Sequence, residues 1–562
     1  MDIRNVLTGL GLAAALCATG CAPDDHLEGA SGILDMASID AIFQDVSGDD
    51  GPGCAVAVSR DGQEIMARAY GMSNLETDTP NGAETIFEAG SVSKQFASAA
   101  VIMLAMDGEL SLDDDIREHF PEMPDYGSPI TVRMLTNHTS GLRDWGSVAS
   151  IEGWPRWSRV HEHLHAFDII SRQRALNYPP GEYYSYTNSG YTLIAMLVER
   201  VTGKSFEEFS QNRIFQPLGM TNTQWRDDFS EIVKGRSVAY RRGDDGQWRS
   251  SMPFENVYGN GGLLTTVSDL LKFTHNLETG EVGGPEFLDL MHQRGVLNSG
   301  KEISYASGLV HGFGRGTTSV GHGGATAGYR AQLTRYPEAG FAVSVLCNLA
   351  EANAWDRAAS VAGVFFGDSD SGGGGNETAT EASPADVQTA EAVAGLYRDP
   401  RNGWPVRVSA EGASIRVGGL FAPDGEGGYS TSTASLTPEW MDGPELDGRR
   451  VAALVRNDPN TDALRLERVE PFEPTTAQLQ QYTGTYTSDE AEAAYTVVVE
   501  QEQLALADRY DRTMPLEPVY EDGFSVGPTG AILIFRRDGG GRVVRASLSQ
   551  GRVWDLRLER VR

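Results

Sequence analysis

The sequence predicts an α/β domain followed by two all-β, barrel-like domains. Helical and strand-like patterns alternate over residues 33–366. Residues 367–389 follow, and they are rich in the Gly, Ser, Asp and Thr that are typical of a flexible linker. Beyond the linker the chain shows short alternating runs and no long segment of helical period. This pattern indicates two β domains, at residues 390–471 and 472–562.

The two β domains repeat one another. Gly395-Leu396-Tyr397 returns 89 residues later as Gly484-Thr485-Tyr486, and residues 464–469 return unchanged 92 residues later at 556–561. Units of this length can close their own sheet edges as small antiparallel barrels or sandwiches. We therefore expect two similar folds in tandem.

The charge of the chain excludes some partners. Asp and Glu number 78 against 46 Lys and Arg, which gives a formal net charge of −32 over 562 residues. A surface of this charge repels nucleic acids and anionic lipid headgroups. We expect no nucleic-acid partner, and contact with a membrane only through a lipid anchor.

The N-terminus predicts export. Residues 1–20 form an apolar segment, with Arg4 near its start, that is too short to span a bilayer as a stable helix. Small residues before Cys21 resemble a bacterial lipoprotein signal, with Cys21 lipidated and residues 21–32 as a tether; an ordinary secretory signal is the alternative. The protein is then expected at the periplasmic face, and Ala22 points to the outer membrane by resemblance to Gram-negative sorting.

Two cysteines remain in the interior of the exported chain. Cys54 and Cys347 each lie in an apolar, strand-like run, residues 54–58 and 341–347. We interpret them as buried thiols. A disulfide between them is compatible with the sequence but is not indicated by it.

The first candidate for chemistry is a serine at the start of an apolar helix. Gly90 interrupts a strand-like run, Ser91 falls in the first turn, and Gly108 fits the end of the helix. Lys94 lies three residues after Ser91, so both side chains share one face. A desolvated lysine with a lowered pKa can remove the proton of a serine hydroxyl, which is otherwise a weak nucleophile. Ser-x-x-Lys alone is a weak pattern, but here it lies in an otherwise apolar helix.

Two further segments carry polar side chains beside turns or glycines. Tyr186 and Asn188 follow a Pro-Pro-Gly loop and project to one side of an extended turn, where they could share proton transfer and substrate binding or simply pack. His322 precedes Gly323 and Gly324 in a strand-like run, and glycines there let another backbone approach closely. An acyl substrate on a sheet edge needs such an approach, although a lone surface histidine is the alternative.

In chain order, these segments resemble the three active-site motifs of the serine β-lactamase and penicillin-binding-protein superfamily. The motifs are Ser91-Val92-Ser93-Lys94, Tyr186-Thr187-Asn188 and His322-Gly323-Gly324, and their starts are 95 and 136 residues apart. Residues 135–142 and 260–266 are similar to further signatures of the class C branch. The resemblance covers residues 33–366.

The resemblance implies a fold and a mechanism. The domain would contain a five-stranded antiparallel sheet flanked by helices, with an inserted all-helical lobe and the active site at the seam. Ser91 would attack an acyl carbonyl, while Lys94 and Tyr186 pass its proton to the leaving group, and water would hydrolyse the acyl-enzyme. Substrate binding would fall to Asn188, His322, Gly324 and Ala325, with the N–H groups of Ser91 and Ala325 as the oxyanion hole. No cofactor or metal ion is expected.

The third motif indicates the branch of the superfamily. True class C β-lactamases carry Lys-Thr-Gly where this chain has His322-Gly323-Gly324, and none of the chain's five lysines can replace the missing one. A His-x-Gly motif followed by two β-barrels is instead similar to the D-aminopeptidases and esterase-like relatives. We expect a hydrolase of small peptides, amides or esters, or of peptidoglycan fragments, more than an efficient β-lactamase.

Two rival interpretations remain. Residues 161–165 satisfy His-Glu-x-x-His, so His161 and His165 could bind zinc while Glu162 activates water. No convincing third ligand segment follows, and such short patterns recur by chance. The other rival is a non-catalytic envelope protein that keeps this fold to bind peptidoglycan peptides, which the intact Ser91 and Lys94 argue against.

Overall fold

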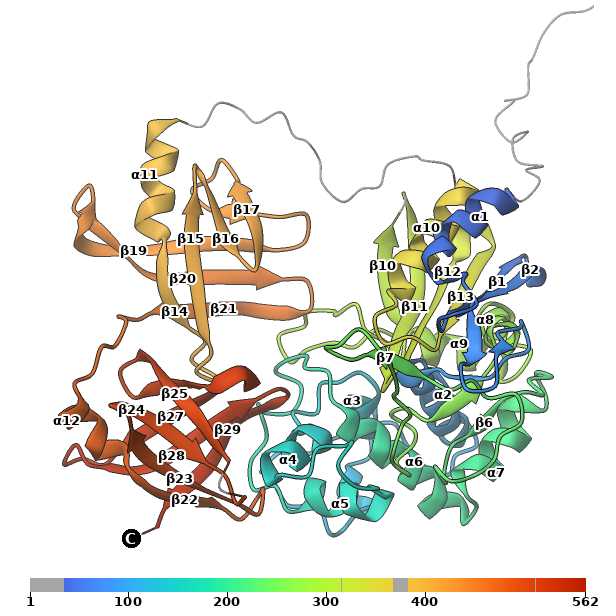
Figure 1. Cartoon of the computed structure of the whole chain (residues 1–562), viewed down its shortest axis with the longest axis horizontal. Helices are drawn as coiled ribbons and strands as arrows, with labels where there is room; N and C mark the ends of the chain where they lie inside the picture. The colour runs from blue at the N-terminus through green and yellow to red at the C-terminus, as the bar shows by residue number, and fades with distance from the viewer. Residues whose placement is uncertain (1–34, 315, 367–382, 511, 562) are drawn as a thin grey trace, which may run out of the picture.

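The computed structural model describes residues 35–314, 316–366, 383–510 and 512–561. It shows an α/β domain and two closed β-barrels (Figure 1), which confirms the expected fold class. The predicted signal segment, its tether and Cys21 lie outside the described residues. Within the described residues, no helix is long and apolar enough to cross a membrane.

A six-stranded antiparallel sheet forms the centre of the α/β domain, in the order β10-β11-β12-β13-β1-β2. It has one strand more than the five that the resemblance implies, because β10 pairs with β11 along the sheet edge. The strands are β1 (Cys54–Arg60), β2 (Gln63–Tyr70), β10 (Val310–Gly314), β11 (Thr317–Thr326), β12 (Tyr329–Tyr336) and β13 (Phe341–Cys347).

Successive side chains of β1 point to opposite faces of this sheet and enter two separate cores. Val56 and Val58 pack with α1 (Met36–Ile42) and α10 (Ala354–Phe366). Ala55 and Ala57 belong to the larger core on the other face. The helices on that side are α2 (Ser93–Met106), α8 (Val267–Thr279) and α9 (Gly284–His292).

A helical lobe is inserted between β2 and β10, as the resemblance implies. Its helices are α3 (Val132–Thr136), α4 (Trp145–Glu152), α5 (His163–Ser171), α6 (Asn188–Thr202) and α7 (Phe206–Ser210). Seven short strands form three small sheets outside the main one: β3 (Met72–Asn74), β4 (Thr79–Pro80), β5 (Phe87–Glu88), β6 (Gln224–Trp225), β7 (Tyr240–Arg242), β8 (Trp248–Ser250) and β9 (Leu263–Thr265).

The two interior cysteines form a disulfide, so the interpretation as buried thiols was wrong. Cys54 and Cys347 are directly paired residues of the neighbouring strands β1 and β13. Their distance in the chain hid the pairing, because it depends on the register of two strands 293 residues apart.

The two barrels contain eight strands each and share a local design that explains the sequence repeat. Tyr397 and Tyr486 occupy equivalent positions, and each hydroxyl donates to the carbonyl four residues earlier. Arg468 and Arg560, from the repeated segment, lie about 6.0 and 5.9 Å from the two tyrosine rings.

The first barrel comprises β14 (Gly395–Arg398), β15 (Pro405–Glu411), β16 (Ser414–Val417), β17 (Gly419–Pro423), β18 (Tyr429–Ser430), β19 (Ser435–Leu446), β20 (Arg449–Asp458) and β21 (Thr461–Arg468). The second comprises β22 (Gly484–Ser488), β23 (Ala493–Glu500), β24 (Gln503–Ala507), β25 (Thr513–Tyr520), β26 (Gly523–Val526), β27 (Ala531–Arg537), β28 (Val543–Gln550) and β29 (Val553–Arg560).

The end of the predicted linker is helical. Helix α11 (Pro384–Val393) begins inside the predicted range 367–389 and packs Ala390 and Val393 into the core of the first barrel. Its start carries a capping box between Ser383 and Asp386, a signal that the linker prediction passed over. A four-residue helix, α12 (Thr476–Leu479), precedes the second barrel.

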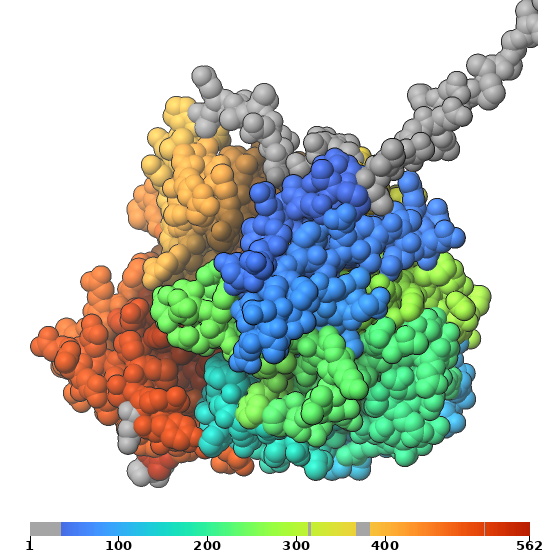
Figure 2. Space-filling model, turned by 45° about the vertical axis from the view of Figure 1, so that its right-hand side comes forward, coloured from blue at the N-terminus to red at the C-terminus, as the bar shows by residue number. Residues whose placement is uncertain are grey.

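The second barrel docks on the helical lobe through buried polar contacts. Arg143 donates to the Glu490 carboxylate at 2.6 Å and to the carbonyl of Trp554 at 3.3 Å. The Tyr495 hydroxyl donates to the carbonyl of Ile151. In the space-filling view the red surface of this barrel meets the cyan surface of the lobe (Figure 2). This contact holds the turn between β28 and β29 beside the lobe.

Candidate active site

The local backbone brings Ser91 and Lys94 together at the start of α2. Gly90 has a φ of +52° and opens a single 3-10 turn, Gly90–Val92, which leads directly into the helix. Ser93 Oγ donates to the carbonyl of Gly90 and accepts the N–H of Leu263, which fixes the turn. Lys94 Nζ consequently lies 3.2 Å from Ser91 Oγ.

Lys94 is completely buried and has three polar neighbours. Its Nζ lies 3.0 Å from Asn188 Oδ1 and 2.6 Å from the carbonyl oxygen of Asn260, besides Ser91. Burial lowers the pKa of Lys94 well below its usual value, and the charge of Arg552 lowers it further. A neutral amine has two N–H donors and one lone pair. The two carbonyl-type oxygens take the donors, so the lone pair is left for the Ser91 hydroxyl.

Tyr186 closes the other side of this group. Its ring lies 4.8 Å from Lys94 Nζ and 4.2 Å from the ring of His138. No hydrogen bond to the buried Tyr186 hydroxyl is formed among the described residues, although Ser91 lies near enough to lower the pKa of Tyr186 in part. Burial raises the pKa of Tyr186, so the phenol is protonated at neutral pH. The side chain is therefore placed to give and receive a proton.

Asn188 begins α6 and is held by a buried carboxylate. Its backbone N–H donates to Asp144 Oδ2 at 2.8 Å, and Asp144 also caps α4 through the N–H of Ser147 at 3.0 Å. This contact fixes the Asn188 side chain against Lys94. Asp144 was not among the site residues predicted from the sequence, although it lies two residues after the framework segment 135–142.

The glycines of β11 let the strand lie against the nucleophile turn. A Cβ at Gly324 would sit 2.0 Å from the carbonyl oxygen of Ala89 and 3.1 Å from the nitrogen of Ser91. A Cβ at Gly90 would sit 2.7 Å from the nitrogen of Ala325. The backbones of Ser91 and Ala325 are thus neighbours across this contact, as an oxyanion hole between their N–H groups requires.

His322 lines the site, but both of its ring nitrogens are already engaged. Nδ1 lies 2.5 Å from the carbonyl oxygen of Gly323, so it carries the proton, and Nε2 accepts from the Tyr305 hydroxyl at 3.0 Å. Burial lowers the pKa of His322 to about 4, which keeps the ring neutral. The ring therefore brings neither a free donor nor a charge to a substrate.

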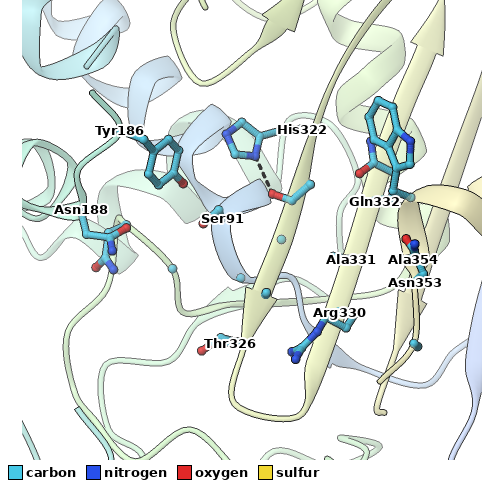
Figure 3. A pocket seen from close by; sticks show the side chains of 18 of the residues that line it. Ser91, Tyr186, Asn188, His322, Thr326, Arg330, Ala331, Gln332, Asn353 and Ala354 are labelled. Carbon is cyan, nitrogen blue, oxygen red and sulfur yellow. Dashed lines mark hydrogen bonds between the residues drawn. The ribbon is translucent and has the colours of Figure 1, made fainter. Parts of the chain in front are cut away.

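These residues line an open pocket of about 690 Å³ (Figure 3). Figure 3 shows Tyr186 and His322 above Ser91, Asn188 to its left and Arg330 below it, at the start of β12. Trp355, after β13, adds an apolar wall. The sequence analysis missed Arg330 and Arg552, because neither lies in or beside a recognised motif.

The predicted zinc pair does not form one helical turn. Helix α5 begins at His163, so His161 precedes it and its Nε2 is bonded to the carbonyl of Trp154. Nδ1 of His165 accepts the N–H of Glu162 as part of the N-terminal cap. Among the described residues, no group of three or more His, Cys, Asp and Glu side chains could hold a metal ion. The zinc interpretation was wrong because these side chains start a helix.

A protein-family comparison decides the class of this domain. The family model described as Beta-lactamase matches residues 39–363, more than half of the chain. The chain belongs to this family. With the relatives described next, the match makes it a serine hydrolase of the β-lactamase and penicillin-binding-protein superfamily.

Curated relatives match the chain to different extents, and one of them matches nearly all of it. A D-aminopeptidase from Cereibacter sphaeroides is 27% identical over 371 residues, which cover 65% of this chain and 67% of that protein. A D-aminopeptidase from Brucella canis is 25% identical over 537 residues, which cover 91% and 96%. The second match spans all three domains of the family member described here.

Solved structures share the fold. The octameric penicillin-binding protein homologue from Pyrococcus abyssi has a TM-score of 0.55 at 22% identity, and the match covers 85% of this chain and all of that one. The D-amino acid amidase from Ochrobactrum anthropi SV3 has a TM-score of 0.51 at 23% identity, covering 58% and 98%. At these identities the likeness concerns the fold alone.

Proposed function

We propose that this protein hydrolyses amide or ester bonds through an acyl-enzyme on Ser91, with a substrate of the D-amino-acid peptide, amide or ester type. The observation that carries the proposal is the buried Lys94, whose Nζ lies 3.2 Å from Ser91 Oγ while Asn188 Oδ1 and the carbonyl of Asn260 accept its other hydrogen bonds. The D-aminopeptidase names of the relatives support the substrate class.

Acylation follows from the positions of three side chains. Ser91 Oγ attacks the substrate carbonyl carbon as Lys94 Nζ takes its proton, and the N–H groups of Ser91 and Ala325 stabilise the oxyanion. Tyr186 donates its phenol proton to the leaving amine or alkoxide and regains one from Lys94. The C–N or C–O bond breaks, and the acyl group stays on Ser91.

Deacylation uses the same groups in reverse. A water molecule gives its proton to the Lys94 and Tyr186 pair and attacks the acyl carbonyl, and Ser91 leaves with a proton returned by that pair. The side-chain amide of Asn188 accepts from Lys94 and orients the substrate, while the backbone N–H of Asn188 is held by Asp144. The intact proton path favours this hydrolytic function over a binding protein without catalysis.

The experiment compares wild type with Ser91→Ala on a 4-nitrophenyl ester, D-alanine p-nitroanilide and nitrocefin. We expect turnover of the ester or the anilide, little turnover of nitrocefin, and loss of all activity in Ser91→Ala. Activity that survives Ser91→Ala would refute the proposal. A chelator is the control, because the serine mechanism needs no metal ion.

We also propose that the protein is exported and anchored through Cys21. The residues before Cys21 and the disulfide between Cys54 and Cys347 support export, because disulfides persist in oxidising compartments. Cys21→Ala should move the protein from the membrane fraction to the soluble periplasmic fraction. Retention in the membrane fraction would contradict the lipid anchor.

A further inference from the structure

The substrate pocket is cationic although the protein is strongly anionic. The charged side chains among its described lining residues are Arg156, Arg330 and Arg552, and no Asp or Glu lines it. The whole chain carries a net charge of −32. A cluster of positive charges at the pocket of a negatively charged molecule indicates that the pocket selects its ligand by charge.

Only some of these charges are free to act on a substrate. Arg156 forms a two-pronged ion pair with Glu255, which is buried. Lys94 is buried with a lowered pKa, and His322 has no free nitrogen. Two cations are left to act on a substrate, Arg330 and Arg552. Arg330 donates only to backbone carbonyls and forms no salt bridge with a described residue.

Arg552 reaches the pocket from the second barrel. It lies in the turn between β28 and β29, and its guanidinium is 4.7 Å from the centre of the Tyr186 ring. Among the described residues, its only ion pair is with Asp144, at 3.6 Å. Asp144 already accepts two backbone N–H groups, and no guanidinium hydrogen bond of Arg552 occurs within the described residues. The guanidinium donors therefore remain open to the pocket.

The backbone of this turn is fixed, so the Arg552 side chain starts from a defined point beside the pocket. The N–H of Arg552 donates to Ser147 Oγ at 3.3 Å, and its carbonyl accepts from Asn177 Nδ2 at 3.0 Å. Next to it, the N–H of Trp554 donates to Asn177 Oδ1 at 2.8 Å. A charge held in place before the substrate arrives costs little ordering entropy on binding.

We propose that Arg552 binds a carboxylate of the substrate, so that the second barrel completes the substrate site and selects anionic substrates. This inference rests on the proposed function of Ser91. A guanidinium presents paired donors that match a carboxylate, whereas it repels an ammonium group. The catalytic domain lacks a charged residue in its third motif, and the barrel supplies a fixed positive charge at the same pocket.

The test measures a preference for charge with two matched substrate pairs. D-alanyl-D-alanine and D-alanyl-D-alanine amide differ in the leaving group, and 4-nitrophenyl hydrogen succinate and its methyl ester differ in the acyl group. Within a pair the Ser91 chemistry is shared, so the ratio of kcat/KM isolates the charge. We expect wild type to favour the member that carries the free carboxylate, in at least one pair, by about ten- to a hundredfold, the effect of one or two charge-assisted hydrogen bonds.

Three variants assign the preference to one residue. Arg552→Gln should bring the ratio close to one, and Arg552→Lys should keep part of it. Arg545→Gln removes an exposed arginine from the same strand, β28, and should keep the wild-type ratio. Added salt should weaken the preference in wild type.

The possible results separate this inference from the proposed function. If esters are hydrolysed through Ser91 but neither pair shows a preference for the anion, or if the preference survives Arg552→Gln, the inference is wrong and the proposed function stands. If neither pair is hydrolysed and a fluorophosphonate does not label Ser91, both are overturned.

Discussion

Lys94 can act as a base because its burial in the fold favours the neutral amine over the charged form. Its Nζ is enclosed by Ser91, Asn188 and Asn260 without a carboxylate partner among its hydrogen bonds. A protonated lysine cannot take the serine proton, so kcat/KM should fall as the pH is lowered through the pKa of Lys94. Because burial lowers this pKa, we expect activity to persist at neutral pH.

Replacement of Lys94 by methionine tests this role. Lys94→Met should lower kcat/KM by about 10²–10⁴ and remove the acidic limb of the pH profile, while exposed Lys204→Met should change neither. In the unfolded chain this lysine binds its proton more readily than in the folded one, so wild-type stability should rise with pH between the two pKa values. Lys94→Met should lack that rise. An unchanged acidic limb in the residual activity would contradict the assignment.

Tyr186 combines a catalytic position with an unsatisfied hydroxyl. Tyr186→Phe keeps the ring contacts with Lys94 and His138 but removes a buried hydroxyl that forms no hydrogen bond among the described residues and lies near Ser91. We expect kcat to fall by about 10²-fold or more. Chemical denaturation should show a free energy of unfolding that is unchanged or higher by about 1 kcal/mol. A clear loss of stability would mean that the hydroxyl serves the fold and not proton transfer.

At the scale of elements, the site depends on how closely β11 approaches the Gly90–Val92 turn. Gly324→Ala would place a Cβ 2.0 Å from the carbonyl oxygen of Ala89, so the strand must move away from Ser91. Loss of one oxyanion donor predicts a fall in kcat of about 10²–10³. Gly82→Ala is the control, because its Cβ would meet only Thr85 Oγ1, at 3.9 Å. Equal activity of the two variants would contradict the oxyanion-hole assignment.

The sequence predicted elements well where the signal is local. The glycine at the end of the apolar helix, the helix itself and the three ordered motifs all lie in short segments. Within each segment, the spacing of the residues determines which side chains lie close together. The disulfide of Cys54 with Cys347 was missed because it depends on the pairing of β1 with β13. The capping box at Ser383 can be recognised in the sequence, but the composition of the residues around it led to the prediction of a linker.

At the scale of the whole molecule, the second barrel is held by a buried ion pair. Arg143→Met would leave Glu490 buried without its partner, at a cost of about 3–5 kcal/mol. We expect faster amide hydrogen exchange in the β28–β29 turn and a lower unfolding midpoint. The exposed pair of Arg465 and Glu439 provides the control, since Arg465→Met should cost less than about 1 kcal/mol. Unchanged exchange in the turn would show that docking does not depend on Arg143.

Arg552 marks the limit of prediction from sequence. It lies in a turn of a repeated β domain, without a motif, and it reaches Tyr186 only because the barrel docks on the helical lobe. Nothing local in the sequence reports such a contact between domains. The nucleophile could be predicted from its neighbours in the chain, whereas the charge of the pocket depends on the assembly of the three domains.

The most direct test of the central claim is the mass of the protein after covalent labelling of its nucleophile. Wild type and Ser91→Ala are incubated with a fluorophosphonate, and the masses of the intact proteins and of their peptides are measured by mass spectrometry. We predict one adduct per wild-type chain, on the peptide that contains Ser91, and none on Ser91→Ala. An adduct on another residue, or equal labelling of both proteins, would contradict Ser91 as the nucleophile.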